Sequence, residues 1–396
     1  MEEGSRREEP LKEEEIWSWG AGTDGQLGTG KLEDELLPQL LHLPSLAASA
    51  AGSISMLACG GAHVVALTSG GRVLTWGRGT SGQLGHGEMV NCLYPKAVNS
   101  LEDHVITHVS AGWSHSGFVS DGGCLFTCGD GSFGQLGHGD YSAYSTPAKV
   151  SYFVNNHVEQ MACGMRHSLV LLKGAGSLGS QVYGFGSGKR GQLGISVEKI
   201  KSANLPRVTA GFEDIQITTI TANGDHSASL SVDGKLYTWG RGFSGSPDIN
   251  VPSCTLPSLS FSQVALGWNH ALLLTDDGEV FMLGGNRHGV LSNTEKMMNT
   301  APNHLPGTER VRIPNGVKVR QIAAGSEHSA LLRVDGEVMT WGWGEHGQLG
   351  LGSTSDETDP CLVRIGSNDS RNEKEAVAIS RVYCGSGFTY VVKAVH

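Results

Sequence analysis

Short runs of alternating hydrophobic and polar residues recur along most of the chain, separated by glycine-rich turns. The runs at 105–111 and 115–120 alternate as strands with one buried face do. The Asp-Gly dipeptide at 121–122 is a strong hairpin signal and leads into a third run, 124–128. A short fourth strand is predicted at 148–150. Four antiparallel strands per unit are typical of one blade of a β-propeller.

The turn between the first and second strands has a repeated sequence: glycine or asparagine, two variable residues, then histidine. It recurs at intervals of 44 to 60 residues, and a period in this range indicates a propeller, solenoid or array. The histidines are His63, His115, His167, His226, His270 and His328. A seventh copy, at 385–388, has Phe388 instead. Because a ring keeps one histidine per blade far apart, we predict structural hydrogen bonds and no metal site.

A large or apolar residue precedes the glycine that ends the third strand of each unit. These anchors are Trp19, Trp76, Cys128, Phe185, Trp239, Leu283 and Trp341. The next loop repeats Gly-Gln-Leu-Gly from Gly25, Gly82, Gly134, Gly191 and Gly347, and is degraded at Gly245-Ser246-Pro247 and Gly289-Val290-Leu291. Seven anchors predict seven blades, and we expect the leucines to fill the interfaces between blades.

The two ends of the chain each supply part of one blade. The last unit stops after its second strand, 389–392, whereas a third strand, 16–20, and its loop stand near the N-terminus. We predict an all-β, seven-bladed β-propeller over 16–396, with one blade shared between the N- and C-termini so that no edge is exposed. Residues 1–15 are predicted to be an acidic, disordered tail. The predicted repeats are approximately 54–105, 106–157, 158–215, 216–262, 263–319 and 320–376, with 377–396 closing against 16–53.

Composition agrees with one closed body of sheet. The 396 residues include 57 glycines and only 13 prolines, as many tight turns between short strands require. A net charge of −10 argues against nucleic acid and anionic membranes, which attract lysine and arginine. No apolar stretch approaches the roughly 20 residues that span a bilayer, and residues 1–9 lack the apolar segment of a signal peptide. We therefore expect no membrane association and a nuclear or cytoplasmic protein.

The eight cysteines include no Cys-x-x-Cys pair, which argues against zinc and redox motifs. Cys59, Cys163 and Cys384 directly precede the repeat glycine. Other units have Ala111, Ala222, Leu266 and Ala324 in that place. We interpret the cysteines as reduced core thiols, and no cofactor is predicted.

Gly-x-x-His-Ser, Asp-Gly, Trp-Gly and Gly-Gln-Leu-Gly, in this order over residues 16–396, resemble the repeats of the regulator of chromosome condensation family. The resemblance implies a propeller with one partner-binding face. The founding member of that family exchanges nucleotide on the small GTPase Ran and docks on nucleosomes. A plant relative senses ultraviolet-B light through tryptophans, and many members are interaction modules. Because a fold does not fix a function, the residues must decide between them.

Strand direction places the Gly-x-x-His turns and the Gly-Gln-Leu-Gly loops at the same end of each blade. The two variable residues of each turn therefore line one face, which we predict to bind a protein partner. The candidate residues are Trp113, Met165, Arg166, Asp225, Trp268, Asn269 and Glu327. Aromatic and arginine side chains are common interface hot spots. The alternative is that Trp113 and Trp268 only fill the mouth of the central channel.

Two family functions are not expected here. Photoreception needs clustered indoles with interleaved arginines, whereas Trp113 and Trp268 stand three blades apart and neither precedes arginine. Nucleosome binding favours a basic tail, whereas residues 1–15 are acidic. The basic stretch Arg310-Val311-Arg312, with Lys318 and Arg320, is interpreted as solvated, although the insertion at 292–319 is a candidate contact site.

Nucleotide exchange needs no covalent chemistry, only a face that displaces the phosphate-binding loop of a GTPase. Polar groups are present in the turns, but Trp113 and Met165 occupy neighbouring turns and the tip at 174–179 is short for a wedge. We therefore predict a non-catalytic interaction or scaffold propeller with a regulatory role. The alternative is a guanine-nucleotide exchange factor for a Ran-like small GTPase. The degraded fifth unit, 240–245, is either a weak point of the ring or a specialised edge.

Overall fold

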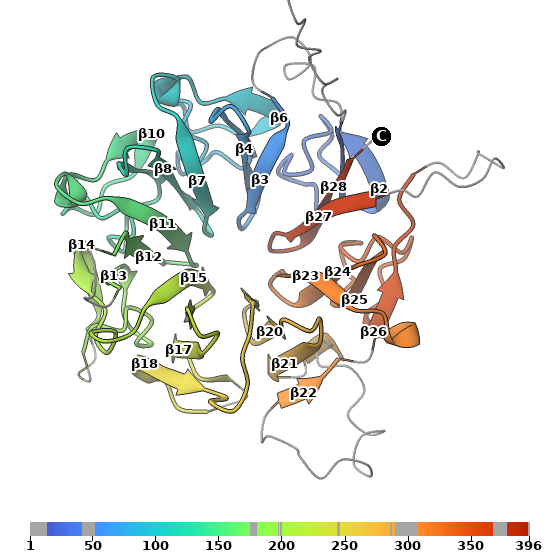
Figure 1. Cartoon of the computed structure of the whole chain (residues 1–396). Coiled ribbons are helices and arrows are strands. Elements are labelled where there is room, and N and C mark those ends of the chain that lie inside the picture. The colour runs from blue at the N-terminus through green and yellow to red at the C-terminus, as the bar shows by residue number, and fades with distance from the viewer. Residues whose placement is uncertain are drawn as a thin grey trace, which may run out of the picture.

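In the computed structural model, seven four-stranded antiparallel sheets surround a central channel (Figure 1). The structure describes residues 14–41, 52–174, 180–196, 198, 200–243, 246–285, 287–289, 308–311, 313–366 and 378–394. Each sheet is one blade, so the predicted all-β, seven-bladed propeller is confirmed.

Three blades come from the first half of the chain. Blade 1 contains β3 (Ile54–Cys59), β4 (His63–Thr68), β5 (Val73–Gly77) and β6 (Cys92–Ala97). Blade 2 contains β7 (Ile106–Ala111), β8 (His115–Ser120), β9 (Leu125–Gly129) and β10 (Tyr144–Lys149). Blade 3 contains β11 (Val158–Cys163), β12 (His167–Leu172), β13 (Val182–Ser187) and β14 (Ser202–Val208).

The second half of the chain adds three blades and joins the N-terminus in a fourth. Blade 4 contains β15 (Ile217–Asn223), β16 (His226–Ser231), β17 (Leu236–Gly240) and β18 (Ile249–Thr255). Blade 5 contains β19 (Gln263–Leu266), β20 (His270–Leu274), β21 (Val280–Gly284) and β22 (Thr308–Arg310). Blade 6 contains β23 (Val319–Ala324), β24 (His328–Arg333), β25 (Val338–Gly342) and β26 (Glu357–Leu362). Blade 7 contains β27 (Ala378–Cys384), β28 (Phe388–Ala394), β1 (Glu14–Gly20) and β2 (Glu35–Leu41).

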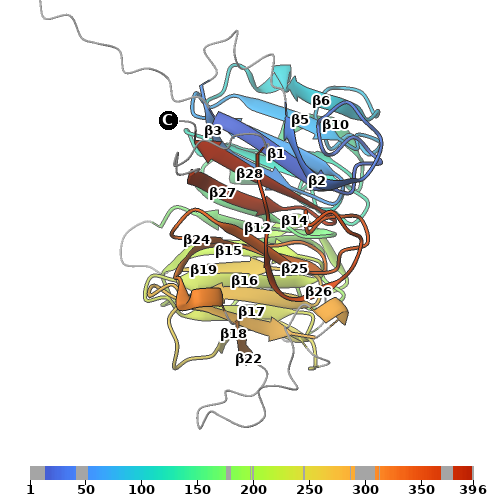
Figure 2. The same ribbon diagram turned by 90° about the vertical axis from the view of Figure 1, so that its right-hand side faces the viewer.

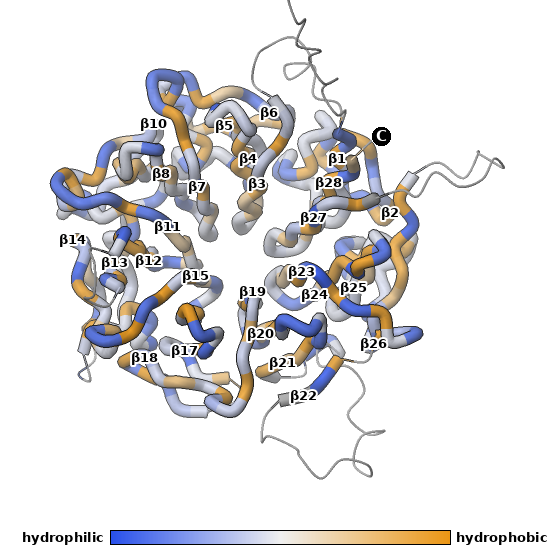
Figure 3. The backbone as a smooth tube through the Cα atoms, in the orientation of Figure 1, coloured by the Kyte–Doolittle hydropathy of each residue, from blue (hydrophilic) through white to orange (hydrophobic). Residues whose placement is uncertain are grey.

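The first strand of each blade lies innermost and the fourth lies at the rim, as Figure 1 shows for β3, β7, β11 and β15. Every residue of the second strands β4, β8, β12, β16, β20 and β24 is buried, because neighbouring blades cover both of their faces. The fourth strands are half-exposed, and the outer loops near β10 and β14 are mostly hydrophilic (Figure 3). Seen from the side, the strands cross the thickness of the disc, so that the loops gather at its two faces (Figure 2).

The ring closes in blade 7, whose sheet order is β2-β1-β28-β27. Strand β1 pairs with β28 at every position from Glu14, opposite Ala394, to Gly20, opposite Phe388. The predicted sharing of one blade between the two termini is therefore confirmed. The strand begins at Glu14, two residues earlier than we predicted, and residues 1–13 of the predicted tail lie outside the described residues.

Each junction between blades has its own hydrophobic cluster, and the closing junction shows how an anchor and a loop leucine meet. Leu27, from the loop after β1, belongs to the same buried cluster as Trp76, the anchor of blade 1. Gly28 has a φ of +71°, and a Cβ atom there would lie 2.8 Å from the indole nitrogen of Trp76. Only glycine therefore lets the loop approach the next blade this closely.

Candidate functional site: the turn face

Seven backbone hydrogen bonds place the Gly-x-x-His turns beside the loops that follow the third strands. In each blade, the residue after the third-strand glycine donates its N–H to the carbonyl of the residue before the histidine position. The pairs are Ala21–Gly387, Arg78–Ala62, Asp130–Ser114, Ser187–Arg166, Arg241–Asp225, Gly285–Asn269 and Trp343–Glu327, at 2.8–3.0 Å. These turns and loops form one face, which we call the turn face.

The repeat histidines bridge neighbouring blades. Five of them hydrogen-bond through Nε2 to a hydroxyl at the start of the next blade's second strand. The pairs are His63–Ser116, His115–Ser168, His167–Ser227, His270–Ser329 and His328–Thr389, at 2.8–3.1 Å. The Ser116 hydroxyl donates its own hydrogen to the Gln83 carbonyl at 2.8 Å, so it must accept from Nε2–H of the imidazole.

The glycine of each turn makes room for the imidazole. A Cβ atom on Gly60 would lie 2.6 Å from Cε1 of His63, and one on Gly325 would lie 2.1 Å from Cε1 of His328. Burial lowers the pKa of His63, His167, His270 and His328 to about 3 and that of His115 to about 4. These imidazoles are therefore neutral at pH 7 and hold blades together, and they are poorly suited to general acid or base chemistry.

His226, in blade 4, makes a different contact. Asn223 occupies the glycine position there, and Ala271 replaces the hydroxyl residue of blade 5. Nε2 of His226 hydrogen-bonds to the carbonyl of Trp268 at 2.7 Å, and its ring stacks on Phe243 with centroids 4.4 Å apart. The bridge between blades 4 and 5 therefore ends on backbone, not on a hydroxyl.

At the seventh position, Phe388 and Val64 share one buried hydrophobic cluster, so an apolar pair replaces the imidazole and the hydroxyl. The Gln26 carbonyl, which a serine hydroxyl would otherwise satisfy, accepts a hydrogen bond from the Tyr390 hydroxyl at 2.7 Å. That hydroxyl in turn accepts from the Trp76 indole at 2.9 Å. The polar groups at this junction are thus satisfied by a different residue.

Trp113 and Trp268 meet on the turn face although they belong to blades 2 and 5. Their ring centroids are 5.3 Å apart with planes at 45°, and both side chains are half-buried. The expectation that the indoles are separated because they stand three blades apart is wrong, since both side chains reach across the channel. Ser114 and Asn269, not arginines, follow the two tryptophans.

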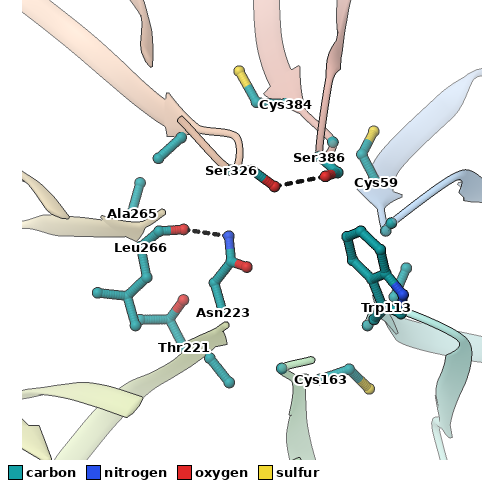
Figure 4. Close-up of a pocket in the computed structure, with 18 of the residues that line it drawn as sticks. Cys59, Trp113, Cys163, Thr221, Asn223, Ala265, Leu266, Ser326, Cys384 and Ser386 are labelled. Carbon is teal, nitrogen blue, oxygen red and sulfur yellow. Dashed lines mark hydrogen bonds between the residues drawn. The ribbon is translucent and has the colours of Figure 1, made fainter. Parts of the chain in front are cut away.

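Both indoles line the channel cavity, which has a volume of about 370 Å³. Two hydrogen bonds join neighbouring turns at this cavity: Ser326 to Ser386 at 2.6 Å, and the Asn223 amide to the Leu266 carbonyl at 2.6 Å (Figure 4). Its remaining walls are formed largely by the small and apolar residues before each repeat glycine, at the ends of the inner strands.

The channel cysteines are not reactive groups. The sulfur atoms of Cys59, Cys163 and Cys384 point away from the middle of the channel (Figure 4). Burial raises the pKa of the Cys163 and Cys384 thiols to about 12, so they are protonated at pH 7 and are weak nucleophiles. The eight cysteines are free thiols. In the described part of the chain, no group of three or more histidine, cysteine or carboxylate side chains is placed to hold a metal ion.

Met165 and Arg166 stand in the turn of blade 3. Met165 is half-buried and donates its backbone N–H to the Gly224 carbonyl at 3.0 Å. Arg166 is exposed, and its guanidinium carbon lies 4.9 Å above the centroid of Phe133 in blade 2. This stacking orients the guanidinium, and its N–H donors remain available to a partner.

Asp225, Asn269 and Glu327 take part in side-chain contacts between neighbouring blades. The Gln192 amide donates to Asp225 at 3.0 Å, and the Asn269 amide donates to Glu327 at 3.1 Å. Glu327 is only 7% exposed, so its carboxylate is held in place. Of the seven predicted partner residues, the structure therefore brings together two pairs, Trp113 with Trp268 and Asn269 with Glu327.

Our sequence reasoning missed a polar cluster beside Glu327. His288 lies between two carboxylates, with Nε2 3.1 Å from Glu327 and Nδ1 2.8 Å from Asp356. Trp343 lies next to it, with ring centroids 5.8 Å apart. A signal was present, since His288 and His346 occupy the same position in the loops of blades 5 and 6.

The basic stretch at 310–320 lies at the opposite end of the channel, where fourth strands connect to the next blade. Arg310 pairs with Glu279, and Lys318 lies 3.8 Å from the same carboxylate. Arg320 donates to the Ile379 carbonyl. Arg312, most of the 292–319 insertion and most of the tip at 174–179 lie outside the described residues. Within the residues described, no helix is long and apolar enough to cross a membrane.

Known proteins are similar to this chain in sequence and in architecture. A family model described as RCC1-like domain matches residues 15–391. The chain is 31% identical over 321 residues to the ultraviolet-B receptor UVR8 of Arabidopsis thaliana, covering 79% of this chain and 70% of the receptor. It is 31% identical over 375 residues to the secretion-regulating guanine nucleotide exchange factor of Bos taurus, covering 88% of this chain and 78% of that protein.

A solved structure shows the same fold. The crystal structure of Prp20p from Saccharomyces cerevisiae, described together with its binding properties to Gsp1p and histones, covers 98% of this chain and 92% of its own. The TM-score is 0.79 and the identity is 24%. Because the family model spans the whole ring and both relatives align over at least 79% of this chain, the chain belongs to the RCC1-like domain family.

Proposed function

We propose that this protein is a non-catalytic interaction or scaffold propeller with a regulatory role, and that the turn face binds a protein partner. The observation that carries the proposal is the contact between Trp113 and Trp268, with ring centroids 5.3 Å apart, on the same face as the exposed Arg166. Large, pre-organised aromatic and arginine side chains bind at low entropic cost. The binding of Prp20p to Gsp1p and histones supports a protein partner for this fold.

The chemistry of the face favours binding over catalysis. The buried imidazoles are neutral structural groups, and the buried channel thiols are protonated. The polar groups of the turns contact one another in fixed arrangements, as Asn269 and Glu327 do. A surface of this kind offers directional contacts and a low cost of ordering.

Paired affinity purifications of the full-length protein test this proposal. Proteins that co-purify with the wild type are quantified against Trp113→Ala and, as a matched control, Tyr152→Ala. Tyr152 is an exposed aromatic residue (46%) near the rim, away from the turns. We expect at least a fivefold loss of the main partner with Trp113→Ala and little change with Tyr152→Ala. A partner that is lost only with Tyr152→Ala would reject the turn face as its binding surface.

A second candidate function is guanine-nucleotide exchange on a Ran-like small GTPase. The similarity to the bovine exchange factor favours it, as does the meeting of carboxylates and an imidazole at Glu327, His288 and Asp356. Such groups can compete for the metal and the phosphate-binding loop that hold a nucleotide.

Release of labelled GDP from Ran separates the two functions. The scaffold proposal predicts the same release rate with and without the protein. An exchange factor would accelerate release at least tenfold, and the combined substitutions Asp225→Asn, Asn269→Ala and Glu327→Gln would abolish that effect. Acceleration that survives these three substitutions would place the exchange site elsewhere.

A further inference from the structure

Positive charge is concentrated in one sector of the turn face. The cations are Arg166, Lys189, Arg190 and Arg241, and all four side chains are exposed. We call these four residues the basic sector. Arg166 comes from the turn of blade 3, Lys189 and Arg190 from the loop after β13, and Arg241 from the loop after β17.

Hydrogen bonds hold these loops against one another. The loop after β13 is joined to the turn of blade 3 by the bond from the Ser187 N–H to the Arg166 carbonyl at 2.8 Å. The same loop reaches blade 4 through the Gln192 amide, which donates to Asp225 at 3.0 Å. Arg241 lies next to Asp225, because the Arg241 N–H donates to the Asp225 carbonyl at 2.9 Å. The four cations therefore project from one connected patch that spans blades 3 and 4.

The charge of the sector is only partly neutralised. Arg190 lies 3.4 Å from Asp248, and the Asp225 carboxylate faces the same patch. Within the described part of the chain, Lys189 and Arg241 have no ion-pair partner. Four cations against two carboxylates leave an excess of positive charge, although the whole chain carries −10.

The opposite half of the face has the reverse character. Carboxylates gather there on blades 6 and 7: Asp34 is half-buried, and Glu345 and Asp356 are exposed. Glu327 is almost fully buried and lies 3.5 Å from Arg287, the cation of the neighbouring loop. A duplex or single strand of nucleic acid laid over the face would be repelled by this half and by the net charge. A compact acidic segment, in contrast, fits the basic sector alone, and each arginine fork matches a carboxylate with two parallel donors.

We propose that the basic sector binds a segment of the protein partner rich in aspartate and glutamate. This inference rests on the proposed function, because it assigns the chemistry of the partner at one part of the turn face. The contact is electrostatic and exposed, so it mainly sets the rate and orientation of encounter and weakens as salt is added.

Fluorescence anisotropy with a labelled ten-residue peptide of alternating aspartate and glutamate tests the inference on the full-length protein. We expect saturable binding at 50 mM salt and at least a tenfold loss of affinity with Arg166→Glu combined with Arg241→Glu. Single charge reversals provide a matched comparison. Arg241→Glu is expected to weaken binding at least threefold, and Arg207→Glu, an exposed arginine on β14, less than twofold.

Three results would overturn the inference: no saturable binding of the peptide, equal effects of Arg241→Glu and Arg207→Glu, or equally tight binding of a labelled ten-nucleotide DNA. Sedimentation velocity tests whether a second copy of this chain occupies the basic sector instead. Self-association that Arg241→Glu abolishes would assign the sector to that second copy and overturn the inference. These failures leave the proposed function intact if Trp113→Ala still releases the partner, because Trp113 lies outside the basic sector. If neither Trp113→Ala nor Arg241→Glu affects partner binding, both proposals are rejected.

Discussion

At the scale of single residues, the repeat histidine links neighbouring blades. Where its contact changes, the residues that surround the histidine differ as well. Where Phe388 stands in its place, Val64 replaces the hydroxyl residue and Tyr390 satisfies the free carbonyl. Where Asn223 replaces the turn glycine, His226 bonds to backbone and Ala271 stands where the hydroxyl would be. The histidine and the hydroxyl of the next blade therefore act as a pair. The turn glycine is retained at Gly385, where a Cβ atom would lie 2.1 Å from the ring of Phe388.

The neutral histidines predict a marked loss of stability in mild acid. Their pKa is about 3 to 4 in the folded protein and about 6.5 in an unfolded chain, so unfolding takes up protons below pH 6.5. Their contribution is fully present above pH 6.5 and is lost as the pH falls, by about 1.4 kcal/mol per pH unit for each histidine. Thermal unfolding between pH 7.5 and 5 should show a steadily falling Tm. A constant Tm over this range would contradict the burial of neutral imidazoles.

The junction between blades 7 and 1 tests the hydroxyl bridge directly. Phe388→His alone should destabilise the protein, since the imidazole would face Val64 and a buried unpaired donor costs about 1–3 kcal/mol. Adding Val64→Ser supplies an acceptor, and the double variant should recover at least about 1 kcal/mol of that loss. Urea unfolding of the wild type, both single variants and the double variant gives the coupling energy. Purely additive effects would show that the bridge contributes nothing.

At the scale of elements, the junction between blades 4 and 5 lacks two side-chain contacts that recur at other junctions, although the Asn223 amide binds the Leu266 carbonyl there at 2.6 Å. Elsewhere, a long polar side chain in the inner strand binds the backbone of the next blade. These contacts are His108–Met161, Gln160–Thr218, Gln263–Arg320, Gln321–Val382 and Arg381–Ser55. Thr219 occupies this position in blade 4, and His226 lacks its hydroxyl partner. Blade 1 has Met56 here but keeps the bridge from His63 to Ser116 at 2.8 Å.

Hydrogen exchange should therefore detect opening first at this junction. Amides of β15 and β19 are expected to exchange faster than those of β11 and β23. The reason is that β11 and β23 have such side-chain contacts with the blades on both sides, whereas β15 and β19 have them on one side only. Mass spectrometry of peptides from these strands measures the difference. Equal protection at all seven junctions, or fastest exchange at the closing blade, would contradict this ranking.

Strands were predictable from this sequence because each blade repeats the same local signals. The turn glycines, hairpin dipeptides and anchors mark boundaries within a few residues, and the split unit at the two ends predicts the pairing of β1 with β28. Contacts across the channel were not predictable, because they depend on how far a side chain reaches and not on strand order. Trp113 and Trp268 are the clearest case, with centroids 5.3 Å apart.

The polar clusters were missed for a related reason. His288 can be recognised as part of a cluster only from its contacts with Glu327 and Asp356. These two carboxylates come from the turn and the outer loop of the next blade. Each residue alone resembles an ordinary polar loop position. The basic sector is hidden in the same way, since its four cations come from three separate segments of a chain whose net charge is −10.

At the scale of the whole molecule, the ring is a rigid support that separates two faces. The strands cross the disc, and the turn face collects residues from all seven blades (Figure 2). On that face lie the indole pair, the basic sector and the cluster around Glu327, whereas the basic stretch at 310–320 lies at the other end and is engaged with Glu279 and backbone. The account therefore places the partner on one face only.

Site-specific photo-crosslinking in cells tests this central claim most directly. A benzophenone side chain is introduced at Ser114 or Glu345 on the turn face, and at Asp121 or Asp276 in hairpins on the opposite face, all in the full-length chain. We predict a discrete adduct with one partner protein from the turn-face positions and none of that mass from the hairpin positions. An adduct from Asp121 or Asp276, with none from Ser114 or Glu345, would contradict the account.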